Sequence, residues 1–176
     1  LWRITNDFWA CWENIMEMFD RCNNWAPYVS EGCFPDCDML PIGHISIRGC
    51  EHGLSDRWTR LSKAEQRTML TLWNIFRSPL MIGCELTDMD EWTKALLTNE
   101  EVLSLLKTSR NAHQVIRQGD MIVWQAEDEE GNVFLAVFNT TNWSETFAID
   151  FRALDLTGSY KLRDLWEQKE LGEVEG

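Results

Sequence analysis

The sequence predicts an α/β half followed by an all-β half, and two patterns support this. Over residues 1–108, short apolar segments alternate with longer segments whose apolar residues recur at helical spacing, as in βα units with a parallel sheet. After residue 108, short strand-like segments alternate with glycine-bearing turns, which is typical of an antiparallel β-sandwich. We therefore expect two domains, residues 1–108 and 109–176.

The first half predicts three strands, each followed by helical sequence. Strands are expected at residues 2–6, 38–43 and 80–83. Asp7 can cap the first helix, whose apolar face is formed by five residues at the spacing i, i+4, i+7, i+8 and i+11: Phe8, Trp12, Ile15, Met16 and Phe19.

Capping signals mark the later helices. Ser62 and Glu65 form a capping box for the second helix, which Ser78-Pro79 ends, because the residue before proline avoids the α region. A further helical stretch begins near Asp88, and a second capping box at residues 98–101 opens the last helix.

In the second half, alternation and turn residues predict five strands. They are expected at residues 113–117, 121–127, 133–139, 145–151 and 159–166. Residues 173–176 read as a polar tail, so the last strands of the sandwich are expected to lie beyond this chain.

Composition excludes several kinds of partner. The net charge of −13 argues against nucleic acid, because phosphate binding requires clustered lysine and arginine. The longest apolar runs are about five residues, far below the roughly 18 of a membrane span. Ten tryptophans are unusual; most are expected to fill the core, but such rings also stack on sugars.

All six cysteines lie in the first half, at positions 11, 22, 33, 37, 50 and 84. Buried free thiols in a reducing compartment are favoured, which favours a cytoplasmic over a secreted protein. Two glycosylation triplets, at Asn139 and Asn142, point to secretion instead. Zinc binding by Cys33, Cys37 and nearby histidines (His44, His52) is disfavoured, because the spacings of a zinc site are absent.

Carboxylates that follow predicted strands are the candidates for chemistry. The carboxyl ends of parallel strands are where a βα barrel keeps its catalytic residues, and Asp7, Asp36 and Asp38 occupy such places. The same residues can be no more than a helix cap and two loop acids, so spacing alone leaves both possibilities open.

Ordered sequence blocks carry a more specific resemblance. WRITNDF, NNWAPY, FPDCDMLPIG, EQRTMLTLWNIFRSPLMIG and LLTNEEV, followed by DMIVWQA, FLAVFN and YKLRDLW, resemble the later part of α-galactosidases, the melibiases of glycoside hydrolase family 27. The resemblance implies the last three βα units of a TIM (β/α)8 barrel followed by a C-terminal antiparallel β-sandwich. The chain would then begin at the sixth barrel strand.

The resemblance also implies retaining hydrolysis of terminal α-galactosides, which uses two carboxyl groups roughly 5–5.5 Å apart. Arg3 and Asp7 match the family's R-x-x-x-D pattern, with Asp7 as acid/base and Arg3 binding substrate. Arg3 is expected to point at sugar hydroxyls rather than at Asp7. Asp38 and Met39 match residues beside the sugar, whereas Asp36 reads as a loop acid. No cofactor and no metal are implied.

Two departures limit what the resemblance implies. Cys33 and Phe34 replace a polar residue and a tryptophan beside the pocket, which leaves the sugar specificity open. The family's Asp-rich nucleophile motif is absent from these 176 residues, so this chain alone is expected to have no meaningful activity. An open parallel edge is a pairing hazard, so self-association or a complementing barrel fragment is expected, besides an α-galactoside oligosaccharide or glycoconjugate as substrate.

Other functions stay open at this point. Within the family, α-N-acetylgalactosaminidase and β-L-arabinopyranosidase are the alternative specificities. Outside it, a non-catalytic carbohydrate-binding or interaction module is the main alternative, and a small Cys/His metal protein is a weaker one.

Overall fold

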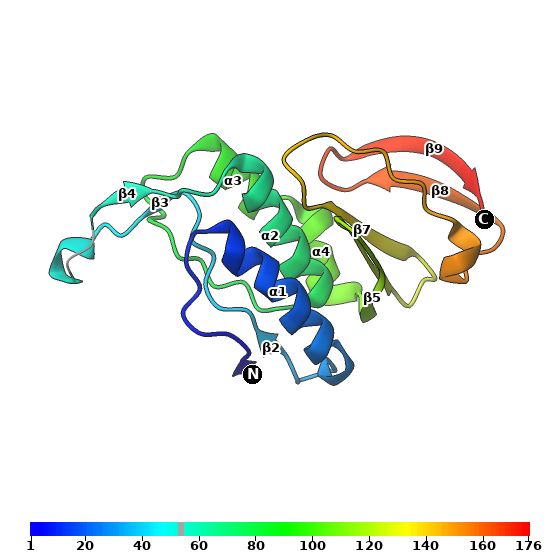
Figure 1. Ribbon diagram of the computed structural model, residues 1–176, viewed down its shortest axis with the longest axis horizontal. Coiled ribbons are helices and arrows are strands. Elements are labelled where there is room, and N and C mark those ends of the chain that lie inside the picture. Colours follow the sequence, from blue (N-terminus) through cyan, green and yellow to red (C-terminus); the bar gives the residue numbers. More distant parts are fainter. Residues whose placement is uncertain (53–54) are drawn as a thin grey trace.

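The computed structural model describes residues 1–52 and 55–176, without the side chains of Cys50 and His52. Helices α1 (Trp12–Trp25) and α2 (Lys63–Phe76) cross the middle of the molecule. The N-terminal strands lie on one side of these helices and the antiparallel strands of the second half on the other (Figure 1).

The first strand, β1 (Trp2–Arg3), is shorter than the predicted 2–6 and pairs in parallel with β2 (Pro35–Asp36). The helix cap predicted for Asp7 is wrong: α1 begins at Trp12, and its N-cap, Cys11, makes no side-chain capping bond. Phe8 therefore precedes the helix and packs edge-on against Trp73, with ring centroids 5.1 Å apart.

The strands predicted at residues 38–43 and 80–83 are reduced to one parallel bridge, between Leu40 and Ile82. Asp38 has a φ of +74°, a left-handed conformation that interrupts the first of these segments. The 3-10 turn η1 (Ala26–Tyr28) follows α1 directly.

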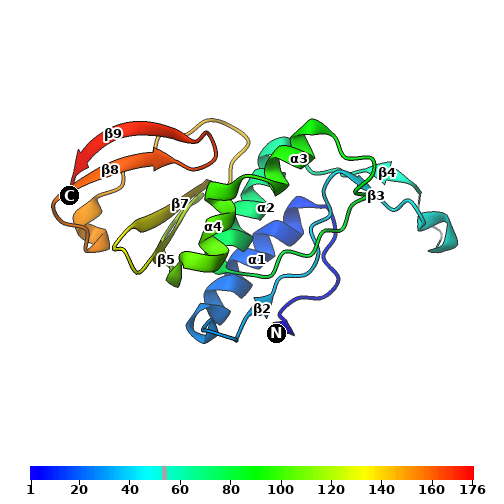
Figure 2. The same cartoon turned by 180° about the vertical axis from the view of Figure 1, so that it is seen from behind.

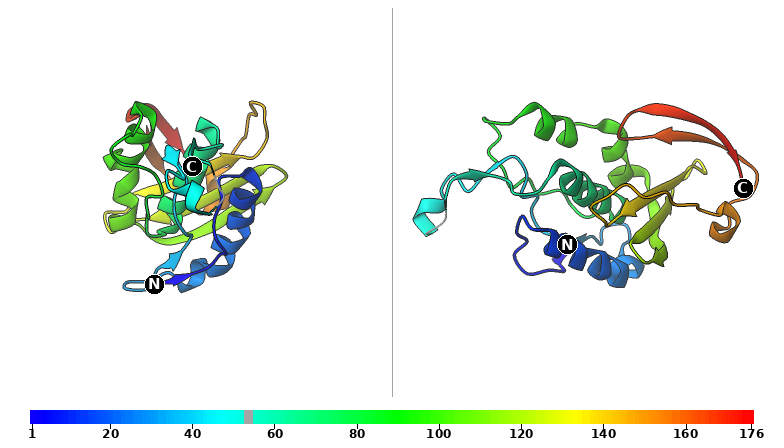
Figure 3. Two further views of the ribbon diagram at one scale, coloured as in Figure 1. Left: turned by 90° about the vertical axis from the view of Figure 1, so that its left-hand side faces the viewer. Right: turned by 45° about the horizontal axis from the view of Figure 1, so that its top comes forward.

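A hairpin of β3 (His44–Ile45) and β4 (Arg57–Trp58), with the 3-10 turn η2 (Gly49–His52), was not expected from the sequence. It extends away from the helices (Figure 3).

The capping box at Ser62 is confirmed. Ser62 Oγ accepts a hydrogen bond from the backbone N–H of Glu65, and Glu65 Oε2 accepts one from the N–H of Ser62. The helix α2 ends at Arg77, which has a left-handed φ of +64°, directly before Ser78-Pro79.

The next two helices begin slightly later in the sequence than predicted. Helix α3 (Glu91–Leu97) is capped by Asp90, and α4 (Glu100–Thr108) by Asn99 rather than Thr98.

Three predicted strands of the second half are confirmed as one antiparallel sheet: β5 (Arg110–Gln118), β6 (Met121–Glu127) and β7 (Val133–Asn139). The fourth predicted strand, at residues 145–151, is wrong, because this segment forms no strand and leads into the 3-10 turn η3 (Phe151–Leu154). The Asp150 side chain accepts a hydrogen bond from the N–H of Arg152, and this local bond competes with strand pairing.

The predicted polar tail is also wrong, because residues 169–175 form β9 (Lys169–Glu175), which pairs with β8 (Ser159–Asp164). The charged residues of β9 give no strand signal in the sequence, but its backbone N–H and C=O groups form hydrogen bonds with β8.

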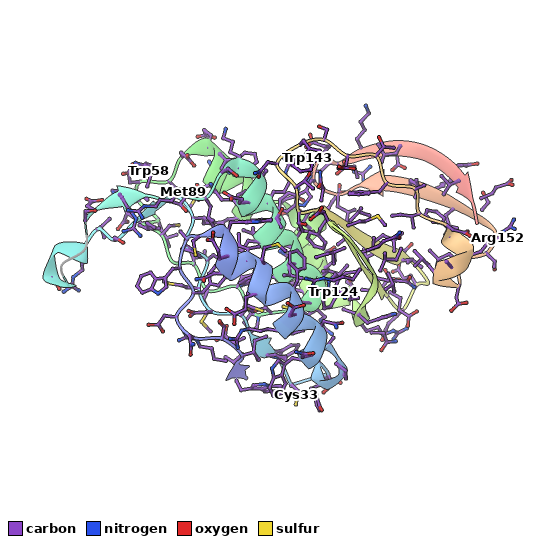
Figure 4. All side chains as sticks on the ribbon, in the orientation of Figure 1. Cys33, Trp58, Met89, Trp124, Trp143 and Arg152 are labelled. Atoms are coloured by element: carbon purple, nitrogen blue, oxygen red, sulfur yellow. The ribbon has the colours of Figure 1, made fainter. Side chains whose placement is uncertain are left out.

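One hydrophobic core joins the two halves. Phe19 of α1 meets Phe138 of β7 with ring centroids 4.9 Å apart, and Phe76 of α2 meets Trp124 of β6 at 6.1 Å. Figure 2 shows the sheet lying directly against these helices, and Trp124 lies at this junction in Figure 4. No helix in the described part is long and apolar enough to cross a bilayer.

Polar contacts fasten the β8–β9 hairpin to the helices. Arg163 bonds both carboxylate oxygens of Glu101, at 2.8 and 2.6 Å. The Asn99 side chain donates to the main-chain carbonyls of Leu165 and Trp166. These paired contacts fix the position of the β8–β9 hairpin relative to α4.

His44 lies between two carboxylates in the projecting hairpin. Its Nε2 contacts Asp56 and its Nδ1 lies 2.8 Å from Asp88, while its ring stacks on Trp58. The hydrogen bond with Asp56 is the main cause that raises the pKa of His44 above 6.5, and Asp88 adds to it. The hairpin is therefore joined to the loop before α3 most strongly when the imidazole is charged.

We predict that His44→Gln lowers stability in a pH-dependent way. A pKa raised by folding stabilises the native state fully below the unfolded pKa of about 6.5, and the contribution is lost as pH rises through the folded pKa. The difference in unfolding free energy between native chain and variant, measured in urea, should shrink with rising pH. It should also shrink when Asp56 and Asp88 are both changed to asparagine; a difference independent of pH would contradict the prediction.

Candidate functional site at the ends of the parallel strands

The parallel register of β1 and β2 brings two carboxylates to one edge. Arg3 lies opposite Asp36, and the N–H of Ile4 donates to the carbonyl of Asp36 at 3.0 Å. Because both strands run in the same direction, the residues that follow them, Asp7 and Asp38, emerge on the same side.

Alternation at the end of β1 and in the residue after it separates core from site. Ile4 is 5% exposed and belongs to the core beneath the helices, whereas the neighbouring Arg3 points to the opposite face. The sequence Arg-Ile-Thr-Asn-Asp thus places a cation on the open face, four residues before the first carboxylate.

Arg3 joins the two carboxylates. Its Nη2 lies 2.8 Å from Asp7 Oδ1 and 3.0 Å from Asp38 Oδ2. The hydrogen bond with Asp7 is the main cause that raises the pKa of the Arg3 guanidinium, followed by the charges of Asp38, Asp7 and Asp36. The expectation that Arg3 points away from Asp7 is therefore wrong, because two adjacent like charges attract the one cation between them.

Backbone contacts fix the position of Asp38. Its Oδ2 accepts a hydrogen bond of 2.7 Å from the N–H of Phe8, and its own N–H donates to Asp36 Oδ1 at 2.8 Å. Trp73 Nε1 donates to the Asp38 carbonyl at 3.3 Å. Aspartate tolerates the left-handed conformation found here, so this turn aims the carboxylate at Arg3.

The two carboxylates differ in exposure. The side chain of Asp7 is 73% exposed, and that of Asp38 is 17% exposed. Asp38 is thus a fixed acceptor held by the protein, while Asp7 is open to a molecule that arrives from solution.

Of the residues considered for zinc, the three with described side chains, Cys33, Cys37 and His44, form no metal-ligating group. Cys37 is buried with its sulfur 3.6 Å from that of Cys22, its N–H donates to Ser78 Oγ, and burial raises the pKa of the Cys22 thiol. Cys33 is exposed, and His44 binds its two aspartates. Across residues 1–52 and 55–176, no group of metal-ligating side chains was found, and the side chain of His52 lies outside the description.

Two other residues predicted beside the pocket, Phe34 and Met39, contact neighbours outside the Arg3–Asp7–Asp38 group. The Phe34 ring packs against the Arg77 guanidinium at 5.4 Å, at the end of α2. Met39 is half-buried, with its sulfur close to Gly83, where an added Cβ would lie 3.1 Å from it. Among the contacts described, none links Met39 to Arg3, Asp7 or Asp38.

A shallow depression of about 460 Å³ opens at the end of β1, lined by Arg3, Thr5, Asn6, Asp7 and Trp9. The sequence indicated Arg3 and Asp7 but not Trp9, which is 47% exposed. The sequence feature that could have indicated Trp9 is the alternation after Asp7, where the apolar Phe8 separates two residues that face outward.

Comparison with known proteins identifies the family. Residues 1–108 match the melibiase family described as alpha galactosidase A, and residues 118–176 match the alpha galactosidase C-terminal beta sandwich domain. The chain belongs to the α-galactosidase (melibiase) family. The fold is accordingly barrel plus β-sandwich; the number of βα units and the division at residue 108 remain predictions.

Individual relatives agree with this family. Alpha-galactosidase 2 of Arabidopsis thaliana is 28% identical over 170 residues, covering 94% of this chain and 39% of its own length. The crystal structure of a GH27 β-L-arabinopyranosidase from Geobacillus stearothermophilus superposes with a TM-score of 0.94 at 49% identity, over 99% of this chain and 40% of that one.

A more distant structure shares the fold: α-galactosidase I of Mortierella vinacea, with a TM-score of 0.82 at 20% identity. It is matched over 99% of this chain and 48% of its own. The chain spans about two fifths of the length of the two plant α-galactosidases it matches, from Arabidopsis thaliana and Oryza sativa, and a quarter of that of an Emericella nidulans relative.

We predict that Asp38→Ala destabilises the fold by about 1–3 kcal/mol, because the N–H of Phe8 loses its acceptor. Asp38→Asn, which keeps an acceptor and tolerates a positive φ, should recover most of that loss. Asp7→Ala at the exposed site should change stability by less than about 0.5 kcal/mol. Urea unfolding of the three variants tests this, and equal effects of Asp7→Ala and Asp38→Ala would contradict it.

Proposed function

We propose that this chain supplies the acid/base side of a retaining glycoside hydrolase of the α-galactosidase type. The observation that supports it is the pair of carboxylates on either side of Arg3, at the carboxyl ends of adjacent parallel strands. The family match gives the reaction class, and the chain covers only part of its relatives, so activity belongs to this proposal.

Asp7 is the proposed acid/base. Its exposed carboxyl can donate a proton to the glycosidic oxygen as the bond to the leaving group breaks, and can then activate water in the second step. Arg3 keeps Asp7 in place until a sugar displaces one of its contacts, after which the guanidinium is free to bind sugar hydroxyls.

Asp38 is the proposed sugar-binding carboxylate. Its Oδ2 is already occupied by the N–H of Phe8 and by Arg3, which weakens it as a nucleophile, while its other oxygen is available to accept sugar hydroxyls. Met39 is proposed to line the same pocket from the following position. The nucleophile is expected from another part of the barrel.

A second specificity has its own support. The structural relative at 49% identity is named a β-L-arabinopyranosidase. β-L-Arabinopyranosides share the ring stereochemistry of α-galactosides and lack the exocyclic hydroxymethyl group. Both sugars therefore suit the proposed contacts of Arg3 and Asp38 with ring hydroxyls.

The proposal is tested with the protein as its gene encodes it, including any residues that precede Leu1. Nitrophenyl α-galactoside and β-L-arabinopyranoside serve as substrates, and Asp7→Asn should lower kcat at least about 100-fold, the contribution typical of general acid–base catalysis. The isolated 176-residue chain should give no turnover. Glycan binding without turnover in the gene-encoded protein, unchanged in Asp7→Asn and Arg3→Ala, would favour the non-catalytic binding module.

The partner proposed for the strand edges is a set of further parallel strands of the same barrel. In the described part, β1 pairs only with β2, and residues around the Leu40–Ile82 bridge are exposed: Met81 is 43% and Ile82 47% exposed. Such edges favour pairing with another chain.

We predict that the 176-residue chain self-associates at micromolar concentration, since these edges remain open. Light scattering after gel filtration should give a mass above that of the monomer, and Ile82→Lys should shift it towards the monomer. Val137→Lys, at an exposed apolar residue of the sheet, is the matched control. A strictly monomeric chain at all concentrations would contradict the prediction.

A further inference from the structure

Trp9 is an exposed aromatic residue beside the proposed acid. Its side chain lines the same depression as Asp7 and Arg3 and is 47% exposed. A tryptophan ring at such a place can stack on a ring of a bound ligand.

The backbone around Trp9 is held in place. Its carbonyl accepts hydrogen bonds from the N–H of Cys11 at 2.8 Å and from Asn14 Nδ2 at 3.3 Å. On its other side, Phe8 is 1% exposed and packs on Trp73. A buried anchor thus separates Asp7 from Trp9, and both side chains face the depression.

Two other exposed tryptophans have aromatic neighbours: Trp58 stacks on His44, and Trp25 packs between Trp2 and Tyr28. A third, Trp143, donates its indole N–H to Glu145. Trp9 has no aromatic or cationic partner among the described residues. Its flat face is available to a ligand.

The position of the ring relative to the carboxylates indicates which ligand group it meets. Asp38, the proposed sugar-binding carboxylate, does not line the depression, whereas Asp7 does. The group that accepts the proton of Asp7 is the glycosidic oxygen, so the atoms just beyond it belong to the leaving group. Trp9 lines the same depression as Asp7, where the leaving group would lie.

We propose that Trp9 forms the binding subsite for the leaving group and determines which leaving groups are preferred. Its indole stacks on a pyranose or aryl ring attached to the oxygen that Asp7 protonates. This inference rests on the proposed function. It specifies the leaving group that the chain would select, which is a ring-bearing aglycone of an oligosaccharide or glycoconjugate.

The test compares substrates that differ only in the leaving group, using the protein as its gene encodes it. The glycosyl fluoride carries no ring beyond the scissile bond, whereas the nitrophenyl glycoside and the disaccharide melibiose do. Trp9→Ala should raise KM for the ring-bearing substrates about fivefold to tenfold, in line with the range for aromatic contacts, and leave the fluoride unchanged. Trp9→Phe should restore most of the loss.

The matched control is Trp143→Ala. Trp143 is 62% exposed and lies on the loop after β7, well away from the N-terminus (Figure 4). Its removal should change no kinetic constant. Equal changes of Trp9→Ala on fluoride and ring-bearing substrates, or no change at all, would overturn the inference. Absence of turnover with every glycoside in the unaltered protein would instead overturn the proposed function.

Discussion

The parallel pairing of Trp2–Arg3 with Pro35–Asp36 is the constraint on which the rest of the site depends. This pairing involves only two residues on each strand, yet it sets the direction in which the segments after β1 and β2 leave the sheet. Asp7 and Asp38 are 31 positions apart in the sequence and share one guanidinium because of it. The alternation of a strand then assigns Ile4 to the core and Arg3 to the open face.

Charge balance explains why Arg3 lies between the carboxylates. In a chain of net charge −13, two aspartates at one strand edge repel each other, and a single guanidinium offsets that repulsion. The same contact holds the exposed Asp7 carboxylate beside the more buried Asp38 at the ends of the two strands.

The second half of the chain supports the first through a shared core. Phe19 and Phe76 on the two central helices pack against Phe138 and Trp124 of the sheet, so the helices that cover β1 and β2 are themselves held by the β-domain. Trp73 of α2 connects this core to the site, because it packs on Phe8 and bonds the Asp38 carbonyl.

The sequence by itself determined the features that depend on nearest neighbours: the capping box of Ser62, the helix stop at Ser78-Pro79 and the strands 121–127 and 133–139, since capping and alternation are local. It also pointed to Arg3, Asp7 and Asp38 through a family pattern. It missed β9, whose charged residues become a strand only when β8 pairs with them, and it missed Trp9. Only the tertiary structure decided that Asp7 bonds Arg3 instead of capping α1, because that choice depends on Asp38 arriving from a distant strand.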